Sequence, residues 1–140
     1  DTGVTNYLAR RRPLPGTPEF GKSFEQVVLM ELMAYRADHE PELEIRFWRT
    51  SGGNEVDFIL NDRQAAVEIK SSERVHDGDC RKLSILSEDG PVGARYIVCD
   101  EKLPRQVSDR FGEIHIMPWR MFLDELWNGG VTRAPVNRSD

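Results

Sequence analysis

Hydrophobic and polar residues alternate along the middle of the chain, which is typical of β-strands. Residues 43–49 and 53–60 are two such runs, and the turn at 50–53 between them contains two adjacent glycines. A short glycine turn between alternating runs predicts a β-hairpin. After a second turn at 61–63, residues 66–70 form a third run, so the sequence predicts three strands in meander order.

The alternation also predicts which side chains share a face, because successive side chains of a strand point to opposite sides of the sheet. In the second strand, one face is expected to hold Val56, Phe58 and Leu60, and the other Glu55, Asp57 and Ile59. In the third strand, one side is expected to hold Val67 and Ile69, and the other Ala66, Glu68 and Lys70. Each strand therefore offers one core face and one face that carries charge.

Helical spacing of apolar residues predicts three helices. Residues 21–37 have apolar side chains three or four positions apart and no proline, which is typical of an amphipathic helix. Residues 77–88 predict a second helix, with Asp77 or Asp79 in position to cap its amino terminus. A third helix is expected from Pro118, with an apolar stripe of Trp119, Phe122, Leu123, Leu126 and Trp127.

Two further strands complete the predicted sheet. Residues 95–99 are expected to form a buried fourth strand, and residues 113–117 a short fifth. Strands and helices in this order predict an α/β domain with a central mixed β-sheet flanked by helices. The domain is expected to span residues 19–128, after a linker at 1–18 and before a mobile tail at 129–140.

Length and composition agree with one small domain. A chain of 140 residues with 39% apolar and 31% charged residues can bury one core but not two. It contains no apolar run that approaches a membrane span and no signal peptide, so a cytoplasmic protein without membrane contact is expected. Cys80 and Cys99 lack metal-site or redox-motif spacing and are expected to be reduced, partly buried thiols.

The net charge of −5 argues against a simple nucleic-acid binder, because affinity for phosphates depends on positive charge. A local basic patch can still supply that charge. Residues 10–12 are three consecutive arginines, most simply part of a solvated linker, and Arg46 and Arg49 lie on the first strand of the hairpin.

The charged faces of the second and third strands bring Asp57, Glu68 and Lys70 together. Asp is unfavourable inside a strand, which indicates a role beyond solubility. Glu25 lies at the border of the apolar stripe of the first helix, where a carboxylate needs a cation, a hydrogen-bond donor or a metal. The alternative is that all four are ordinary solvent-facing charges of half-buried elements.

The helix with Glu25, the hairpin with Asp57 and the run Glu68-Ile69-Lys70 together resemble the PD-(D/E)XK superfamily of restriction-endonuclease-like nucleases. More closely, the chain is similar to the C-terminal domain of unknown function that follows the ATPase domain in many bacterial and archaeal AAA-type ATPases. This similarity spans residues 1–127 and is carried by residues 21–25, 47–60, 67–72 and 118–123. Val56 departs from the superfamily pattern, in which a proline precedes the aspartate.

The resemblance implies a restriction-endonuclease-like fold and metal-dependent hydrolysis of phosphodiester bonds in DNA. Asp57, Glu68 and the backbone carbonyl of Ile69 would be the oxygen ligands of Mg²⁺ or Mn²⁺. The metal would polarise the phosphate and lower the pKa of a bound water. Many members of this superfamily have kept the fold and lost the activity, so the motif implies a metal site more directly than it implies turnover.

The resemblance also assigns roles to the residues around the metal. Lys70 would hold the attacking water, with its ammonium kept close by the carboxylates, and Glu25 would complete the cluster. Glu55 and Ser71 are candidates for hydrogen bonds to these groups. The implied partners are DNA and an upstream ATPase domain. A homo-oligomer is left open as a further possibility.

Residues 16–23 offer a competing interpretation, because they match the P-loop expression G-x-x-x-x-G-K-[ST]. Tyr96 to Asp100 also resemble the acid-ending strand that accompanies a P-loop. However, a P-loop follows a buried strand, whereas three arginines and two prolines precede Gly16. Three functions therefore stay open: a metal-dependent nuclease, a non-catalytic module of the same fold for DNA or partner binding or ATPase assembly, and a P-loop nucleotide-binding protein.

Overall fold

Six strands form one mixed sheet, and three helices cover its two faces. The computed structural model describes residues 18–133. Its elements are α2 (Pro18–Asp38), β1 (Ile45–Arg49), β2 (Glu55–Leu60), β3 (Ala65–Ile69), α3 (Asp77–Asp89), β4 (Ala94–Cys99), β5 (Arg105–Asp109), β6 (Gly112–Pro118) and α4 (Trp119–Trp127). None of these helices is long and apolar enough to cross a membrane.

The sheet has the strand order β1-β2-β3-β4-β6-β5. Strands β1, β2 and β3 form the predicted antiparallel meander, and the hairpin turn between β1 and β2 contains Gly53 at φ 88°. Strand β4 runs parallel to β3 and β6, and β5 pairs antiparallel with β6. Parallel neighbours require a crossover, and α3 supplies it between β3 and β4.

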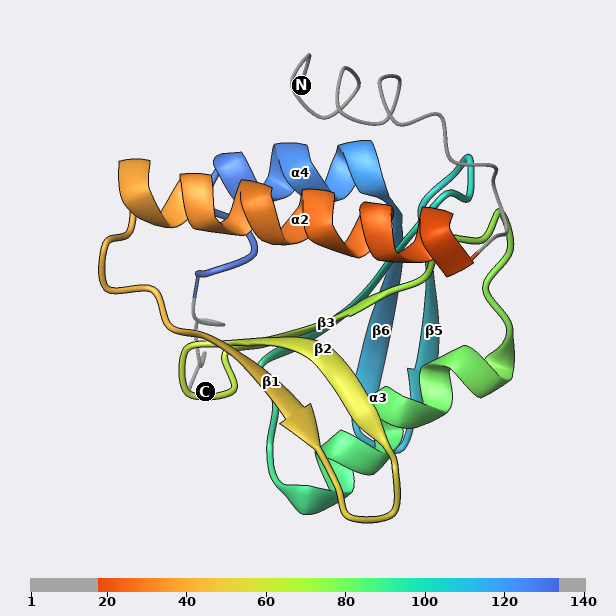
Figure 1. Ribbon diagram of the computed structural model, residues 1–140. Coiled ribbons are helices and arrows are strands. Elements are labelled where there is room, and N and C mark those ends of the chain that lie inside the picture. Colours follow the sequence, from red (N-terminus) through yellow and green to blue (C-terminus); the bar gives the residue numbers. More distant parts are fainter. Residues whose placement is uncertain (1–17, 134–140) are drawn as a thin grey trace, which may run out of the picture.

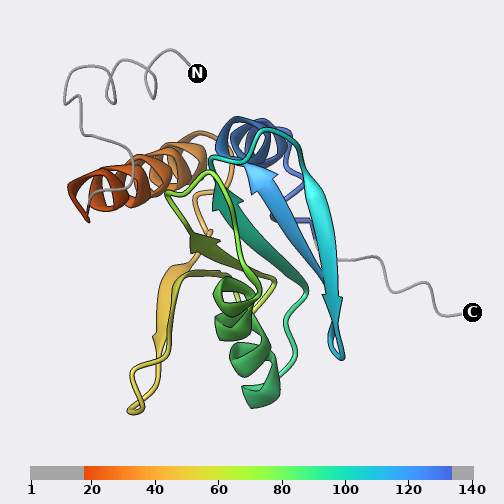
Figure 2. The same ribbon diagram turned by 90° about the vertical axis from the view of Figure 1, so that its right-hand side faces the viewer.

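Two hydrophobic clusters lie on opposite faces of the sheet. Helices α2 and α4 lie side by side and cover one face, while α3 covers the other (Figures 1 and 2). The predicted alternation of β3 is confirmed, because Val67 belongs to the cluster beneath α2 and α4 and Ala66 to the cluster beneath α3. The sheet is thus a middle layer whose two faces are both largely buried.

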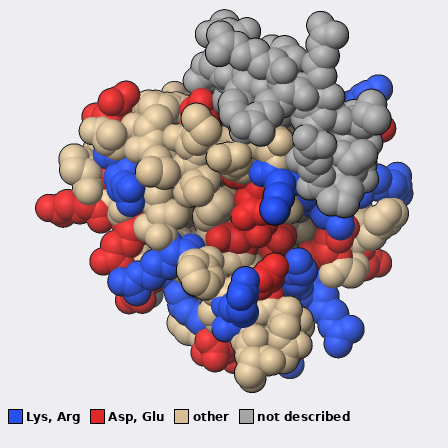
Figure 3. Space-filling model, in the orientation of Figure 1, with Lys and Arg blue, Asp and Glu red and all other residues tan. Residues whose placement is uncertain are grey.

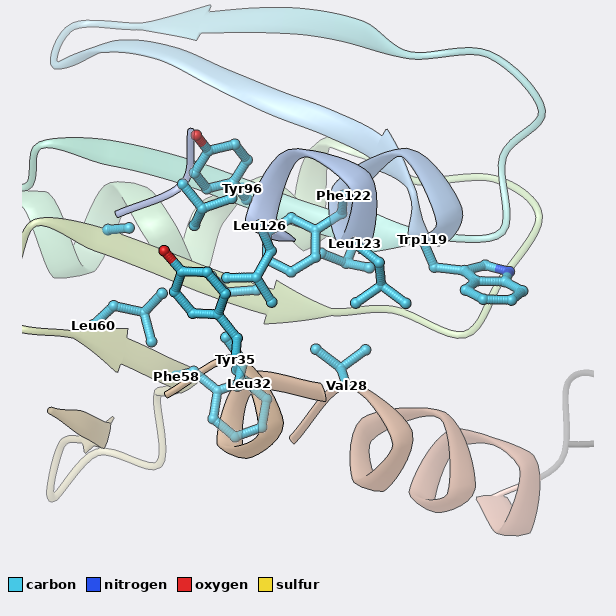
Figure 4. Packing of buried hydrophobic residues seen from close by; sticks show 14 of the residues in the cluster. Val28, Leu32, Tyr35, Phe58, Leu60, Tyr96, Trp119, Phe122, Leu123 and Leu126 are labelled. Atoms are coloured by element: carbon cyan, nitrogen blue, oxygen red, sulfur yellow. The ribbon is translucent and has the colours of Figure 1, made fainter. Parts of the chain in front are cut away.

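The larger cluster fixes the position of α2, the helix that carries Glu25. Phe122 and Leu126 of α4 are fully buried, and they pack in one cluster with Val28 and Leu32 of α2 (Figure 4). Burying a side chain of this size stabilises the fold by about 1.5–3 kcal/mol. The predicted apolar stripe of the last helix is therefore confirmed as core, with Trp127 partly buried at its end.

Three expectations differ from the structure. The amino terminus of α3 is capped through His76, whose backbone N–H donates to Asp79 Oδ2 at 2.8 Å, so neither Asp77 nor Asp79 is the capping residue itself. Strand β5 was not predicted, because Val107 is its one apolar residue and it lies at the edge of the sheet. Val131 and Thr132 are buried, so packing continues beyond residue 128. Of the linker predicted at 1–18, Pro18 begins α2, and residues 1–17 lie outside the described residues, as do the tail residues 134–140.

A buried ion pair ties β5 to the rest of the sheet. Arg95 of β4 donates to both carboxylate oxygens of Asp109 in β5, at 2.6 Å each, and also to the carbonyl of Gly112 at 3.0 Å. These bonds hold the pKa of Asp109 far below its usual range. Cys80 and Cys99 are free thiols, as expected, the first half-buried and the second buried.

Candidate functional site

A β-bulge in β2 determines where Asp57 lies. Arg46 of β1 pairs with Ile59, but Trp48, only two residues later, pairs with Val56. Asp57 and Phe58 therefore together face a single residue of β1, which is the geometry of a bulge. Bulges bend a strand and redirect its side chains, so this one sets the direction of Asp57.

The bulge also corrects the predicted faces of β2. Val56 packs with Ile59 in the cluster beneath α3, whereas Phe58 and Leu60 pack beneath α2 and α4. The expectation that Val56, Phe58 and Leu60 share one face is wrong, because the extra residue shifts the alternation within the strand. A regular strand was the only geometry that the alternation of residue types could indicate.

Asp57 is held against the end of β3. Its Oδ2 accepts a hydrogen bond of 2.8 Å from the backbone N–H of Ile69, one residue beyond Glu68. Phe58 and Val67 are the last paired residues of the β2–β3 ladder at this end. The bond from Ile69 to the side chain of Asp57 adds one more contact between the two strands beyond that pair. This places Asp57 beside Glu68, the two carboxylates that the sequence predicted to act together.

Glu68 is a buried carboxyl group with an unsatisfied oxygen. The residue is 5% exposed, and within the described part of the chain its Oε2 has no hydrogen-bond partner. Burial, followed by the charge and proximity of Asp57, raises its pKa to about 9. At neutral pH this carboxyl group therefore keeps its proton beside Asp57, and a cation that replaced the proton would be held by both carboxylates.

The two lysines near the site are arranged differently from the prediction. Lys70 Nζ lies 3.2 Å from Asp79 Oδ1 on α3, so its ammonium pairs with a helix residue. Lys82, also on α3, places its Nζ 3.6 Å from Glu68 Oε1. The sequence analysis missed Lys82, and its only signal was that it lies three residues after Asp79 on the same predicted helix.

Glu25 lies on α2, which covers the face of the sheet opposite to the one that α3 and Lys82 cover. It is exposed on α2 and lines an open pocket of about 280 Å³ together with Glu55 and Asp57. Its pKa is raised, first by partial burial and then by the charges of Asp57 and Glu55. Glu55 itself is exposed and pairs with Arg49 at 3.0 Å, and Ser71 is half-buried after β3.

A second and larger pocket of about 570 Å³ lies where β4 and β6 end. Asp100 and Trp119 line it, together with Phe24 from α2 and Arg120, whose guanidinium lies 4.9 Å from the centre of the Trp119 ring. Ligands of α/β sheets bind beyond the carboxyl ends of parallel strands, and Glu68 lies near the same end of β3. Acidic side chains gather near the centre of the face seen in Figure 3, with lysines and arginines around them.

The oxygen atoms present fit one hard divalent cation with an incomplete protein ligand set. Between residues 18 and 133, no three His, Cys, Asp or Glu side chains form a group that could hold a metal. Asp57 and Glu68 are two carboxylates, and Mg²⁺ is commonly held by one or two carboxylates while it keeps several waters. With the carbonyl of Ile69, they could hold such a cation, and Glu25 lines the pocket beside Asp57.

The P-loop interpretation gains no support from the described part of its motif. Gly16 and Thr17 lie outside the described residues, but residues 18–23 belong to helix α2. A P-loop wraps its backbone N–H groups around the phosphates before the helix begins. Backbone that is already helical from residue 18 cannot form that part of a phosphate loop.

Comparison with known families gives one match. A family model described as a domain of unknown function, DUF4143, matches residues 20–122. No curated protein matches the chain. The matched span runs from the start of α2 into α4, so it includes the carboxylate pair, both lysines and every strand of the sheet.

Proposed function

Since this chain belongs to DUF4143, a family of domains of unknown function, we propose its function from the geometry of the carboxylate pair. The domain is a restriction-endonuclease-like module that uses Mg²⁺ or Mn²⁺ to hydrolyse phosphodiester bonds in DNA. The observation that carries this proposal is the unsatisfied, buried Oε2 of Glu68 beside Asp57. The topology supports it, because an antiparallel meander is followed by a helix and a parallel strand, as expected of this fold.

Each residue of the site has a defined task in this proposal. Asp57 and Glu68, with the carbonyl of Ile69, hold the cation, which supplies polarisation of the phosphate and a water of lowered pKa. Lys70 and Lys82 are the two ammonium groups within reach of this end of β3. Lys70 would orient the attacking water once its ammonium is released from Asp79, and Lys82 would balance the charge that Glu68 carries after a cation displaces its proton.

Glu25 orients water around the cation, because its pocket opens beside Asp57. We also propose that the domain acts together with an ATPase domain encoded upstream of it. The family resemblance supports this pairing, in which the ATPase delivers the DNA that the domain cuts.

A second candidate function is a non-catalytic module that binds DNA or a partner, or assembles the ATPase. The observation that favours it is the pairing of Lys70 with Asp79 rather than with the carboxylates at the end of β3. In this alternative Lys70 stays paired with Asp79 and Lys82 with Glu68, and no cation is needed.

Calorimetric titration of Mn²⁺ into the natural chain, Asp57→Asn and Asp62→Asn distinguishes the two functions. Asp62 is an exposed aspartate in the turn between β2 and β3, so its substitution makes the same chemical change away from the site. The nuclease proposal expects binding that is lost in Asp57→Asn and kept in Asp62→Asn. Absence of Mn²⁺ binding in all three proteins would reject the metal site and leave the non-catalytic module.

A further inference from the structure

Phe47 is an aromatic side chain that the fold leaves in solvent. It is 73% exposed, the highest value for any Phe, Tyr or Trp from residue 22 to residue 133. Its neighbour Ile45, on the same side of β1, packs against the core beneath α2. Core packing therefore gives no reason for an aromatic side chain at position 47. Burying an aromatic ring would contribute strongly to the stability of a small domain, yet this ring is left exposed.

The position of Phe47 connects it to the carboxylate site. It is the one β1 residue that faces the bulge formed by Asp57 and Phe58. Its side chain lines the pocket of about 280 Å³ that Glu25 and Asp57 also line. This volume is slightly below the range typical of small-molecule sites, so it is large enough for one flat ring.

One arginine lies beside this ring. Arg49 is two residues after Phe47 on the same side of β1, with its Cζ 6.0 Å from the centre of the ring, and it pairs with Glu55 at 3.0 Å. The pair is exposed, and exposed pairs contribute little stability, so a phosphate can replace the glutamate at small cost. An aromatic ring beside a cation is an arrangement that binds unpaired nucleotides.

We propose that Phe47 and Arg49 form a subsite for single-stranded DNA, in which one unpaired base stacks on Phe47 and Arg49 holds an adjoining phosphate. The inference rests on the proposed function and gives it a substrate class. Inside a duplex both faces of each base are covered by its neighbours, and only the outer faces of the two terminal pairs are free, so a single strand offers many more free base faces to the ring. The pocket then places the next phosphate towards Asp57.

The test measures DNA binding in EDTA, so that it does not depend on metal or on cleavage. The probes are a fluorescently labelled single strand of about 12 nucleotides, the length range of single-strand sites, and a blunt duplex of the same sequence. Fluorescence anisotropy gives the Kd of the natural chain, Phe47→Ala, Phe47→Tyr and Phe111→Ala. Phe111 is the matched control, because it is 41% exposed with Arg110 4.7 Å from its ring, but lies in the β5–β6 turn at the other edge of the sheet.

We expect the natural chain to bind the single strand more tightly than the duplex. Phe47→Ala should weaken single-strand binding by about 5- to 150-fold, as expected from the loss of one stacked base. Phe47→Tyr, which keeps the ring, and Phe111→Ala should bind as the natural chain does.

Equal affinity for strand and duplex, equal affinity of Phe47→Ala and the natural chain, or no binding of the strand would each overturn the subsite. These outcomes are separate from failure of the proposed function, which appears as absence of Asp57-dependent Mn²⁺ binding. If Mn²⁺ binding depends on Asp57 but the Kd for the single strand does not depend on Phe47, the metal site is supported and the single-strand subsite is rejected.

Discussion

The carboxyl group of Glu68 should make the folded chain less stable as the pH rises. Burial, and then the charge of Asp57, raise the pKa of this group to about 9, against an ordinary value of 4.5. Between these two values the folded chain keeps a proton that the unfolded chain has lost, so a rise in pH favours unfolding. The stabilising contribution of the neutral carboxyl is complete below the ordinary pKa and declines until the folded pKa is reached.

One pKa unit corresponds to about 1.4 kcal/mol. Raising the pH from about 5.5 to about 7.5 should therefore lower the free energy of unfolding by roughly 2–3 kcal/mol through Glu68 alone. Glu68→Gln has nearly the same shape and no titrating proton, so this slope should disappear. Above about pH 7 the variant should be more stable than the natural chain, with a Tm higher by roughly 6–15 °C for a domain of this length.

The assay is urea unfolding followed by tryptophan fluorescence at a series of pH values, for the natural chain, Glu68→Gln and Glu42→Gln. Glu42 is an exposed glutamate in the turn before β1, so its substitution removes the same charge without touching the site. The variable that matters is the difference in stability between each variant and the natural chain. A difference for Glu68→Gln that does not change with pH would refute the reasoning.

Three further outcomes follow from named contacts. Lys70→Ala should abolish DNA cleavage and leave the Tm unchanged, because this lysine is 46% exposed; retained cleavage would transfer its role to Lys82. Arg95→Ala should cost roughly 2–3 kcal/mol in urea unfolding, because it removes both bonds to Asp109, and a smaller loss would show that β5 is held by other contacts. Phe122→Ala should cost about 3–5 kcal/mol in the same experiment, because the ring is fully buried, and a loss under 1 kcal/mol would contradict its place in the core.

The elements built from strong periodicity were predictable from the sequence. The helix over residues 21–37 and the meander of the first three strands appear with small shifts of their ends, because apolar spacing and glycine turns are local signals. Strand β5 was not predictable in this way. It is stabilised by its pairing with β6 and by Arg95, and neither contact is visible in the pattern of residues 105–109.

The candidate site was predictable as residue types but not as geometry. The spacing of Glu68 and Lys70 indicated a shared face, and the third strand has that alternation. The bulge at Asp57 depends on how two strands align, so no property of β2 alone could reveal it. Lys82 reaches Glu68 only because α3 crosses the sheet at that point, which is a consequence of tertiary packing.

The exposed ring of Phe47 has a consequence for association between molecules. Within the described residues, β1 is the last strand on its side of the sheet, and an edge strand with an exposed hydrophobic side chain is a template for aggregation. Arg46 and Arg49 keep charge on both sides of that ring, and a second β1 edge paired there would have to desolvate them. The two arginines thus allow the chain to keep an aromatic ring in water, and replacing both should lower its solubility.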